Sequence, residues 1–155
     1  MEIEELVKKN LIDDSTLNLE NRKIGSEGAK KLAEMEILTN VVNLELGENN
    51  LGDDGVVALC ESPYLTRLKV LNLKSNGITA DGAKALAASS NFSRLDQLIL
   101  KFNRIGEEGA KVIADSEILS QLTTLDLFRN QIGPGGTRAI KTSKNLTRVS
   151  RVRLD

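Results

Sequence analysis

The chain has 155 residues, the length of one ordinary domain, and 40% of them are apolar although aromatic residues make up only 3%. Its formal net charge of −1 gives no overall attraction to nucleic acid or to an anionic membrane, so we expect neither as a partner. The absence of histidine removes the Ser-His-Asp and Cys-His types of catalytic site together with the commonest metal ligand. We therefore expect no metal site, no cofactor and no enzymatic activity, although a pair of carboxylates could still perform acid–base chemistry.

The same sequence predicts a cytoplasmic protein. Its apolar runs are only a few residues long, and the N-terminal segment Met1–Glu5 is acidic and lacks the apolar core of a signal peptide. A precursor trimmed ahead of Met1 would give the same pattern. The single Cys60 cannot form an internal disulfide, and alanine occupies its position in other repeats, which indicates a small buried side chain.

In chain order, the first predicted element is an N-terminal capping helix over residues 1–10. Ile3, Leu6 and Val7 form one apolar stripe, and acidic and basic side chains cover the rest of the helix surface. A helix of this kind shields the first layer of a repeat structure, because the end units of such structures need a polar outer face. We expect one domain over residues 1–155, with this helix as its first part.

Five copies of a 27-residue unit follow, and a partial sixth unit occupies residues 146–155. Each unit contains the pattern L-x-x-L-x-L, in which the last two leucines lie two residues apart and share one face of a strand. One of these positions recurs without insertion or deletion, as Leu17, Leu44, Leu71, Leu98, Leu125 and Val152. A fixed period of this length indicates a stacked repeat architecture, in which we expect consecutive strands to run parallel.

In each of the five units the strand pattern is followed by a turn that ends at a glycine and then by a helix; an asparagine follows the strand in four units, and Arg22 takes its place in the first. We expect the asparagine side chains to turn inward and bond backbone groups at the strand ends, in a ladder of Asn49, Asn76, Asn103 and Asn130. After each glycine the apolar period becomes that of a one-sided helix, as in Ala83, Leu86 and Ala87. In four units an acidic residue precedes the glycine and favours a helix N-terminus: Glu27, Asp54, Asp81 and Glu108.

Strands and helices alternate, so each connection between neighbouring strands crosses over through a helix and should be right-handed. Strands pack ~4.8 Å apart and helices ~8–10 Å apart, so the stack should curve into a horseshoe arc with strands on its concave face and helices on its convex face. The consensus L-x-x-L-x-L-x-x-N-x-I-G-x-x-G-A-x-x-L-A resembles the ribonuclease-inhibitor-like class of leucine-rich repeat over roughly residues 11–155, and the stretch 82–87 is similar to the GALA-type repeats of bacterial effectors. The resemblance implies an α/β solenoid and says almost nothing about function.

The strand positions that do not repeat lie between the leucines, where side chains point away from the core. Early units carry acidic or neutral residues there, whereas later units carry basic residues beside apolar ones. We predict a partner-binding site on the concave face, formed by Val70, Lys74, Ile99, Lys101, Phe102, Phe128, Arg129, Arg151 and Arg153. An apolar anchor ringed by basic residues is typical of a protein-binding hot spot. The spacing leaves open whether Phe102 faces this surface or the core.

These patterns predict a non-catalytic protein-interaction module that binds a protein partner on its concave face. Two alternatives stay open. The chain is a fragment of a larger regulatory or effector-adaptor protein, or it associates with itself as a weak dimer through the uncovered strand at residues 149–154. The exposed strand floor measures on the order of 300 Å², well below the ~800 Å² that each partner buries in a standard interface, so other surfaces would have to contribute.

Overall fold

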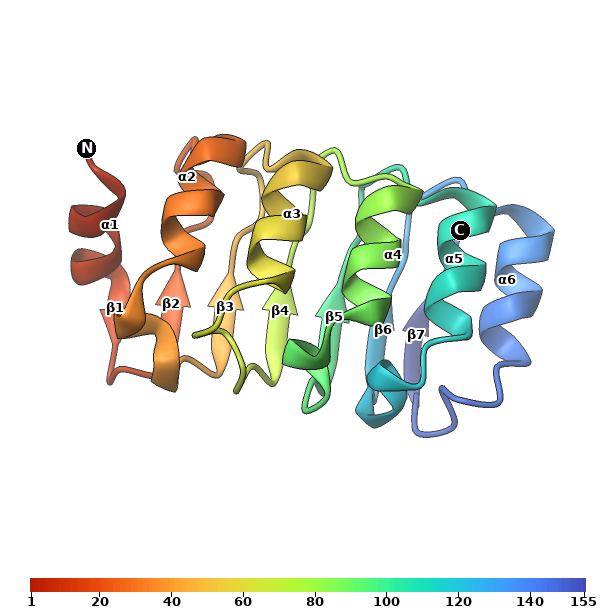
Figure 1. The fold of residues 1–155 in the computed structure, drawn as a ribbon. Coiled ribbons are helices and arrows are strands. Elements are labelled where there is room, and N and C mark those ends of the chain that lie inside the picture. Colours follow the sequence, from red (N-terminus) through yellow and green to blue (C-terminus); the bar gives the residue numbers. More distant parts are fainter.

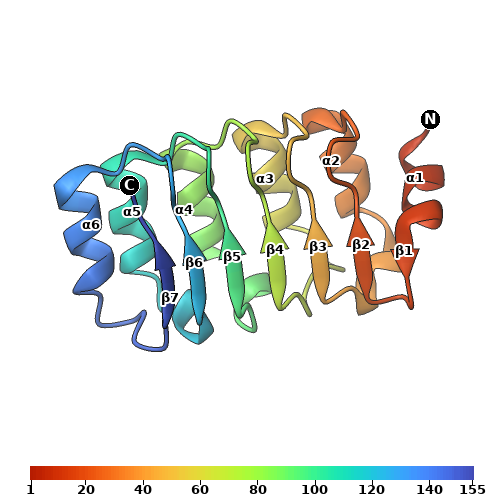
Figure 2. The ribbon, with the colours of Figure 1, turned by 180° about the vertical axis from the view of Figure 1, so that it is seen from behind.

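The computed structural model describes residues 1–155 as two layers, a sheet and a row of helices (Figure 1). In chain order the elements are α1 (Ile3–Asn10), β1 (Leu11–Ile12), β2 (Thr16–Asn18), α2 (Gly25–Ala33), η1 (Glu36–Asn40), β3 (Asn43–Glu45), α3 (Gly52–Cys60), β4 (Val70–Asn72), α4 (Ala80–Ala88), η2 (Ser90–Phe92), β5 (Gln97–Ile99), α5 (Gly106–Ala114), η3 (Ile118–Gln121), β6 (Thr124–Asp126), α6 (Gly133–Lys141) and β7 (Arg151–Arg153). The strands form one open sheet in the order β1-β2-β3-β4-β5-β6-β7. The helices cover one face of this sheet, and Figure 2 shows the other face uncovered. The α/β solenoid predicted from the repeats is confirmed.

The strands β2 to β7 run parallel, and each residue pairs with the residue one repeat further along the chain. Leu44 lies opposite Leu17 on one side and opposite Leu71 on the other. The same register continues to the last pair, Leu125 and Val152. Because the pairing follows the 27-residue period without a slip, every strand keeps its leucines on the helix side of the sheet.

The strand β1 departs from the expected parallel arrangement, because it pairs antiparallel with β2. The two strands are joined by a tight turn in which Asp13 and Asp14 both adopt left-handed backbone angles, with φ of 51° and 57°. The Ser15 N–H donates to the Ile12 carbonyl and closes the turn at 3.1 Å. Consecutive left-handed residues match the twist of a β-hairpin, and aspartate tolerates that conformation better than most residues do.

The sequence pattern indicated that each repeated glycine ends a turn, and this prediction is wrong. The helices begin two or three residues before these glycines, which therefore lie inside the first helical turn. A Cβ atom at Gly82 would lie 2.5 Å from Ile78 Cγ2 and 2.6 Å from Asp53 Oδ1. Both distances are shorter than real Cβ contacts. The glycine is therefore required by close packing inside the first helical turn.

The carboxylate of Asp53 in α3 caps the N-terminus of α4 in the next repeat. Its Oδ1 accepts hydrogen bonds from the N–H groups of Thr79, at 2.8 Å, and Gly82, at 3.1 Å. Its Oδ2 accepts the Thr79 hydroxyl at 2.6 Å. This side chain satisfies N–H groups that have no partner within the helix, and it ties two repeats together.

The asparagine side chains form a ladder of hydrogen bonds between repeats at the C-terminal ends of the strands. Asn76 is representative: its Oδ1 accepts from the N–H groups of Asn49, at 3.0 Å, and Leu51, at 3.2 Å. Its Nδ2 donates to the carbonyls of Leu46, at 2.9 Å, and Lys74, at 3.1 Å. All four ladder asparagines are buried: Asn49, Asn76, Asn103 and Asn130.

The last rung of the ladder is made by a carboxylate. Asp155 accepts from the N–H groups of Asn130, at 2.9 Å, and Ile132, at 2.8 Å. In the rung made by Asn76 one amide oxygen accepts both of the corresponding groups, whereas here each carboxylate oxygen accepts one. The backbone of the final turn is thereby satisfied without a further asparagine.

A second ladder, built from serines, joins the C-terminal ends of the helices. The Ser89 hydroxyl donates to the Cys60 carbonyl at 2.7 Å, and the Ser116 hydroxyl donates to the Ala87 carbonyl at 2.6 Å. Ser62 and Ser143 make the same bond to alanine carbonyls in their own preceding repeats. Between the two ladders, the leucine layers stack into one continuous apolar core.

Cys60 is half-buried at the end of α3 and packs against that core, so its inward placement agrees with the alanine position it occupies. Burial, with a smaller effect from Glu61, raises the pKa of the thiol to about 12 from an ordinary value of 9.0. Below pH 9.0, the ordinary pKa of the thiol, Cys60 is neutral in both the native and the unfolded protein, so its ionisation does not affect the free energy of unfolding. As the pH rises above it, the unfolded chain ionises while the native chain does not, so native stability falls.

We therefore expect Cys60 to react slowly with thiol reagents at pH 8 in the native protein and quickly in denaturant. The rate of labelling by an aromatic disulfide reagent, measured with and without urea, checks this. A Cys60→Ala variant is the matched control for the pH effect, because it should lose less stability than the parent protein above pH 9.0. Fast labelling of the native protein would contradict a neutral, poorly accessible thiol.

Candidate functional site

The face of the sheet turned away from the helices is formed by the first and third residues of each strand. In β4 the middle residue Leu71 is buried, whereas Val70 and Asn72 on either side are half-buried and point to the uncovered face. The same alternation occurs in β3 and β5. We call this surface the sheet face; it is the concave side of the solenoid, and Figure 2 shows it unobstructed.

Two phenylalanines and two arginines come together at the C-terminal end of the sheet face. The rings of Phe102 and Phe128 meet edge to face, with centroids 5.9 Å apart and planes at 73°. The guanidinium carbon of Arg153 lies 4.6 Å from the centroid of Phe128, and that of Arg129 lies 5.5 Å from the same centroid. Both distances are within the range of cation–π attraction. We call these four residues the aromatic cluster.

The buried carboxylate of Asp126 supports the aromatic cluster from below. Its Oδ1 accepts the N–H of Phe128 at 3.0 Å, and its Oδ2 lies 3.4 Å from Nη1 of Arg153. The residue is only 6% exposed, so it holds the backbone of one aromatic residue and the guanidinium of one arginine from inside the surface. The candidate set from the sequence lacks Asp126. The repeat contains a signal for this role of Asp126. Asn18 and Asn72 occupy the same repeat position, and each accepts a hydrogen bond from the N–H of the residue two positions later in the chain.

Phe102 faces solvent, which answers the question that its spacing left open. Phe102 is 47% exposed, and its backbone is left-handed with φ of 60°. The same repeat position is left-handed in the other units, at Asn21, Glu48, Ser75 and Arg129. A left-handed phenylalanine is strained by about 1–3 kcal/mol, and the recurrence of this conformation in every unit shows that the repeat imposes it.

A hollow of about 400 Å³ adjoins the aromatic cluster and is lined by Phe128, Arg129, Gln131 and Asp155. Gln131 and Asp155 were not among the candidate residues. Gln131 has a left-handed backbone with φ of 58°, and Asp155 is held by the last rung of the asparagine ladder. The walls of this hollow are therefore fixed by the backbone as well as by the two large side chains.

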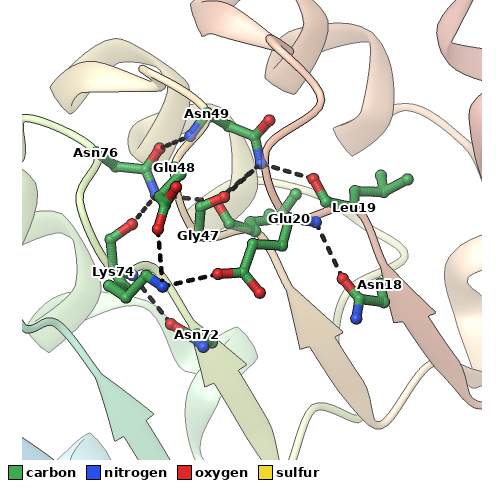
Figure 3. A network of polar contacts seen from close by, with 10 residues as sticks. Asn18, Leu19, Glu20, Gly47, Glu48, Asn49, Asn72, Lys74 and Asn76 are labelled. Carbon is green, nitrogen blue, oxygen red and sulfur yellow. Dashed lines mark hydrogen bonds and ion pairs between the residues drawn. The ribbon is translucent and has the colours of Figure 1, made fainter.

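Lys74 belongs to a separate network near the first strands, which Figure 3 shows from close by. Its Nζ lies 2.7 Å from Oε1 of Glu20 and 2.9 Å from Oε1 of Glu48. These two carboxylates raise the pKa of Lys74, with hydrogen bonding to Glu20 as the larger cause. The lysine is already paired within the chain, so it would have to give up these ion pairs to bind a negatively charged group of a partner.

Gly47 makes this pairing possible, because Glu20 and Lys74 reach one another across the space where its side chain would lie. A Cβ at Gly47 would stand 3.4 Å from Oε1 of Glu20 and 3.5 Å from Cε of Lys74, which are ordinary contacts. A longer side chain would separate the charges. Gly47→Leu should therefore destabilise the protein by about 1 kcal/mol relative to Gly47→Ala.

Thermal unfolding of Gly47→Leu and Gly47→Ala side by side measures this difference. The raised pKa of Lys74 means that the ion pair contributes fully below pH 10.5, the ordinary lysine value, and that the contribution is lost as the pH rises through the native value. The two variants should therefore converge in stability at strongly alkaline pH. Equal stability at neutral pH would show that the network adds nothing.

The remaining candidates lie on the sheet face but outside both networks. Val70, Ile99 and Lys101 are half-buried, and Arg151 is exposed on β7. None of their side chains takes part in a hydrogen bond or ion pair. The structure therefore brings together four of the nine predicted residues, Phe102, Phe128, Arg129 and Arg153, and separates Lys74 from them by its own partners.

No group of three or more His, Cys, Asp and Glu side chains is placed to hold a metal ion. None of the helices has both the length and the apolar composition needed to cross a membrane.

Comparison with known proteins identifies the repeats. The model of the leucine-rich repeat family matches residues 38–60, 64–87, 95–114 and 120–141, which together make up more than half of the chain. A search of curated proteins finds no match.

Solved structures give further similarity. An internalin from Listeria monocytogenes is 31% identical over 81% of this chain, with a TM-score of 0.58, and the chain spans only 31% of that protein. The tropomodulin C-terminal domain of Caenorhabditis elegans is 17% identical, with a TM-score of 0.68 over 96% of this chain and 93% of its own. Actin-binding site 2 of leiomodin-1 is 20% identical, with a TM-score of 0.51 over 98% of this chain and 76% of its own. The last two similarities concern the fold alone. With family matches over more than half of its length and a strand and helix in every repeat, the chain belongs to the leucine-rich repeat family.

Proposed function

We propose that the protein is a non-catalytic protein-interaction module that binds a protein partner on its sheet face through the aromatic cluster. The observation that carries this proposal is the arrangement around Phe128, whose ring contacts Phe102 edge to face and lies within cation–π distance of two arginines. Aromatic and arginine side chains supply most of the binding energy at protein interfaces, and they do so where they are clustered.

The aromatic cluster is organised before any partner binds. Asp126 holds the backbone of Phe128 and the guanidinium of Arg153, and the asparagine ladder fixes the strand ends from which the cluster projects. Side chains that are already in place lose little conformational entropy on binding, which increases affinity.

The fold neighbours support the class of function and leave the partner open. One of them is an actin-binding site of leiomodin-1, so the same architecture serves protein binding in that molecule. The identity of 20% carries the fold and no residue of that site. We therefore extend to this chain the binding of a protein, and we assign no particular partner.

The proposal is tested by quantitative affinity capture with the immobilised protein from a native lysate of its source. Wild-type bait should retain a partner that bait altered in the aromatic cluster does not retain. A protein that is captured equally by both baits binds elsewhere and contradicts the proposed site.

A further inference from the structure

A polar groove lies at the N-terminal ends of the strands, at the opposite end of the sheet from the aromatic cluster. It has a volume of about 570 Å³ and no apolar residue in its lining, which consists of Lys69, Ser93, Arg94, Asp96, Gln121, Thr123 and Arg148. We call it the basic groove, because three of the seven side chains are cationic and one is anionic.

The repeat places these residues in two rows across neighbouring strands. Lys69, Asp96 and Thr123 each come directly before a strand, at the starts of β4, β5 and β6. The second row consists of Arg94, Gln121 and Arg148. Each of these residues lies two positions before the first-row position of its own repeat. The groove therefore runs across four repeats, along the direction in which the strands stack.

The positive charge of the basic groove is not neutralised within the chain. Arg148 donates to the side-chain oxygen of Gln121, which is a neutral amide. Arg67, one repeat before Arg94, likewise donates to the amide oxygen of Asn40 at 2.8 Å. These contacts orient the guanidinium groups and leave their charge available.

The only acid in the lining, Asp96, accepts the hydroxyl of Thr123 instead of pairing with a cation. Neither Lys69 nor Arg94 makes a side-chain hydrogen bond or an ion pair. All six ion pairs of the protein lie elsewhere, and they include the pairing of Lys74 with two glutamates on the same strand ladder. The groove therefore gathers three cationic side chains that have no ion-pair partner within the chain.

We propose that the basic groove binds an acidic, extended segment of a protein, whose aspartate and glutamate carboxylates pair with Lys69, Arg94 and Arg148. The planar guanidinium group donates two parallel hydrogen bonds to a carboxylate, and a row of such groups at repeat spacing matches a chain of carboxylates. The lining has no aromatic or apolar residue on which bases could stack, which disfavours single-stranded nucleic acid as the occupant. This inference is independent of the aromatic cluster, from which it differs in position and chemistry.

The test uses a fluorescein-labelled oligoglutamate peptide as the probe and fluorescence anisotropy as the readout. Wild-type protein should bind it, and affinity should fall as salt concentration rises, because the ion pairs are exposed. Arg94→Gln with Arg148→Gln should weaken binding by about fivefold to tenfold. The matched control, Arg138→Gln with Lys141→Gln, removes the same charge from exposed positions on α6 and should bind like wild type.

Two further measurements make the result decisive. Phe128→Ala should bind oligoglutamate like wild type, because the groove does not include the aromatic cluster. This variant therefore tests the groove separately from the proposed partner site. Equal binding by the groove variant and wild type would overturn the proposal, as would an equal loss in the α6 control. Stronger competition by an oligothymidylate than by unlabelled oligoglutamate would reassign the groove to nucleic acid. Circular dichroism of each variant confirms that it is folded.

Discussion

Asn76→Ala is expected to destabilise the protein by about 3–5 kcal/mol, because two buried N–H groups lose their acceptor and two carbonyls each lose one of their donors. The side chain accepts from the N–H groups of Asn49 and Leu51 and donates to the carbonyls of Leu46 and Lys74. Asn76 is 1% exposed, so water cannot replace these bonds without opening the strand end. Urea denaturation followed by circular dichroism measures the loss.

Two other variants distinguish the effect of losing a ladder asparagine from the effect of losing any asparagine side chain. Asn40→Ala removes an exposed asparagine whose oxygen accepts one bond, from Arg67 at 2.8 Å, and should change stability by less than about 0.5 kcal/mol. Asn76→Asp keeps the acceptor and loses the two donated bonds, so it should fall between the two alanine variants. If Asn76→Ala were no more harmful than Asn40→Ala, the ladder would have no role in stability.

Phe128→Ala combined with Arg129→Ala is expected to lower partner affinity by at least about thirtyfold, corresponding to about 2 kcal/mol or more for the loss of a hot spot. The double change removes the ring at the centre of the aromatic cluster and one of the two guanidinium groups that contact it. Phe128 is half-buried and Arg129 is exposed, so most of the apolar core is untouched and the protein should remain folded.

Surface plasmon resonance with the captured partner measures the affinity, and thermal unfolding verifies the fold. Arg138→Ala with Lys141→Ala, on the helix side, is the matched control and should leave the affinity unchanged. A single Phe102→Ala change should give a smaller loss, because it removes the edge contact and leaves the stacked arginines. Wild-type affinity in the Phe128/Arg129 variant, with the fold intact, would rule out the aromatic cluster as the binding site.

The sequence was sufficient for the burial and the strand pairing that follow from the period. Leu71 and its equivalents had to be buried on one strand face, and residues 27 apart had to pair if the strands stacked in register. The hairpin of β1 was missed because it depends on the backbone angles of Asp13 and Asp14, which occur once and have no equivalent in later repeats.

The candidate site was harder to predict, since it depends on which side chains meet. Phe102 and Phe128 are close because both lie just beyond strand ends, Phe128 two residues after β6 and Phe102 at a left-handed turn position after β5, and spacing alone does not reveal the turn conformation. Lys74 was predicted to face a partner, but Gly47 leaves a gap through which it reaches Glu20, two repeats away. Asp126 was not predicted, because its role depends on the hydrogen bond from the Phe128 N–H and on its contact with Arg153, which spacing does not reveal.

The pairing of Lys74 with Glu20 has a consequence for how the molecule opens. It joins residues 54 positions apart, whereas every other side-chain hydrogen bond or ion pair joins residues at most 32 apart. In a protein whose units otherwise contact only their neighbours, a link that skips one unit couples the opening of three. In native-state hydrogen exchange, the amides of β2, β3 and β4 should therefore become exposed together, whereas those of β5 to β7 should fray progressively from the C-terminal edge.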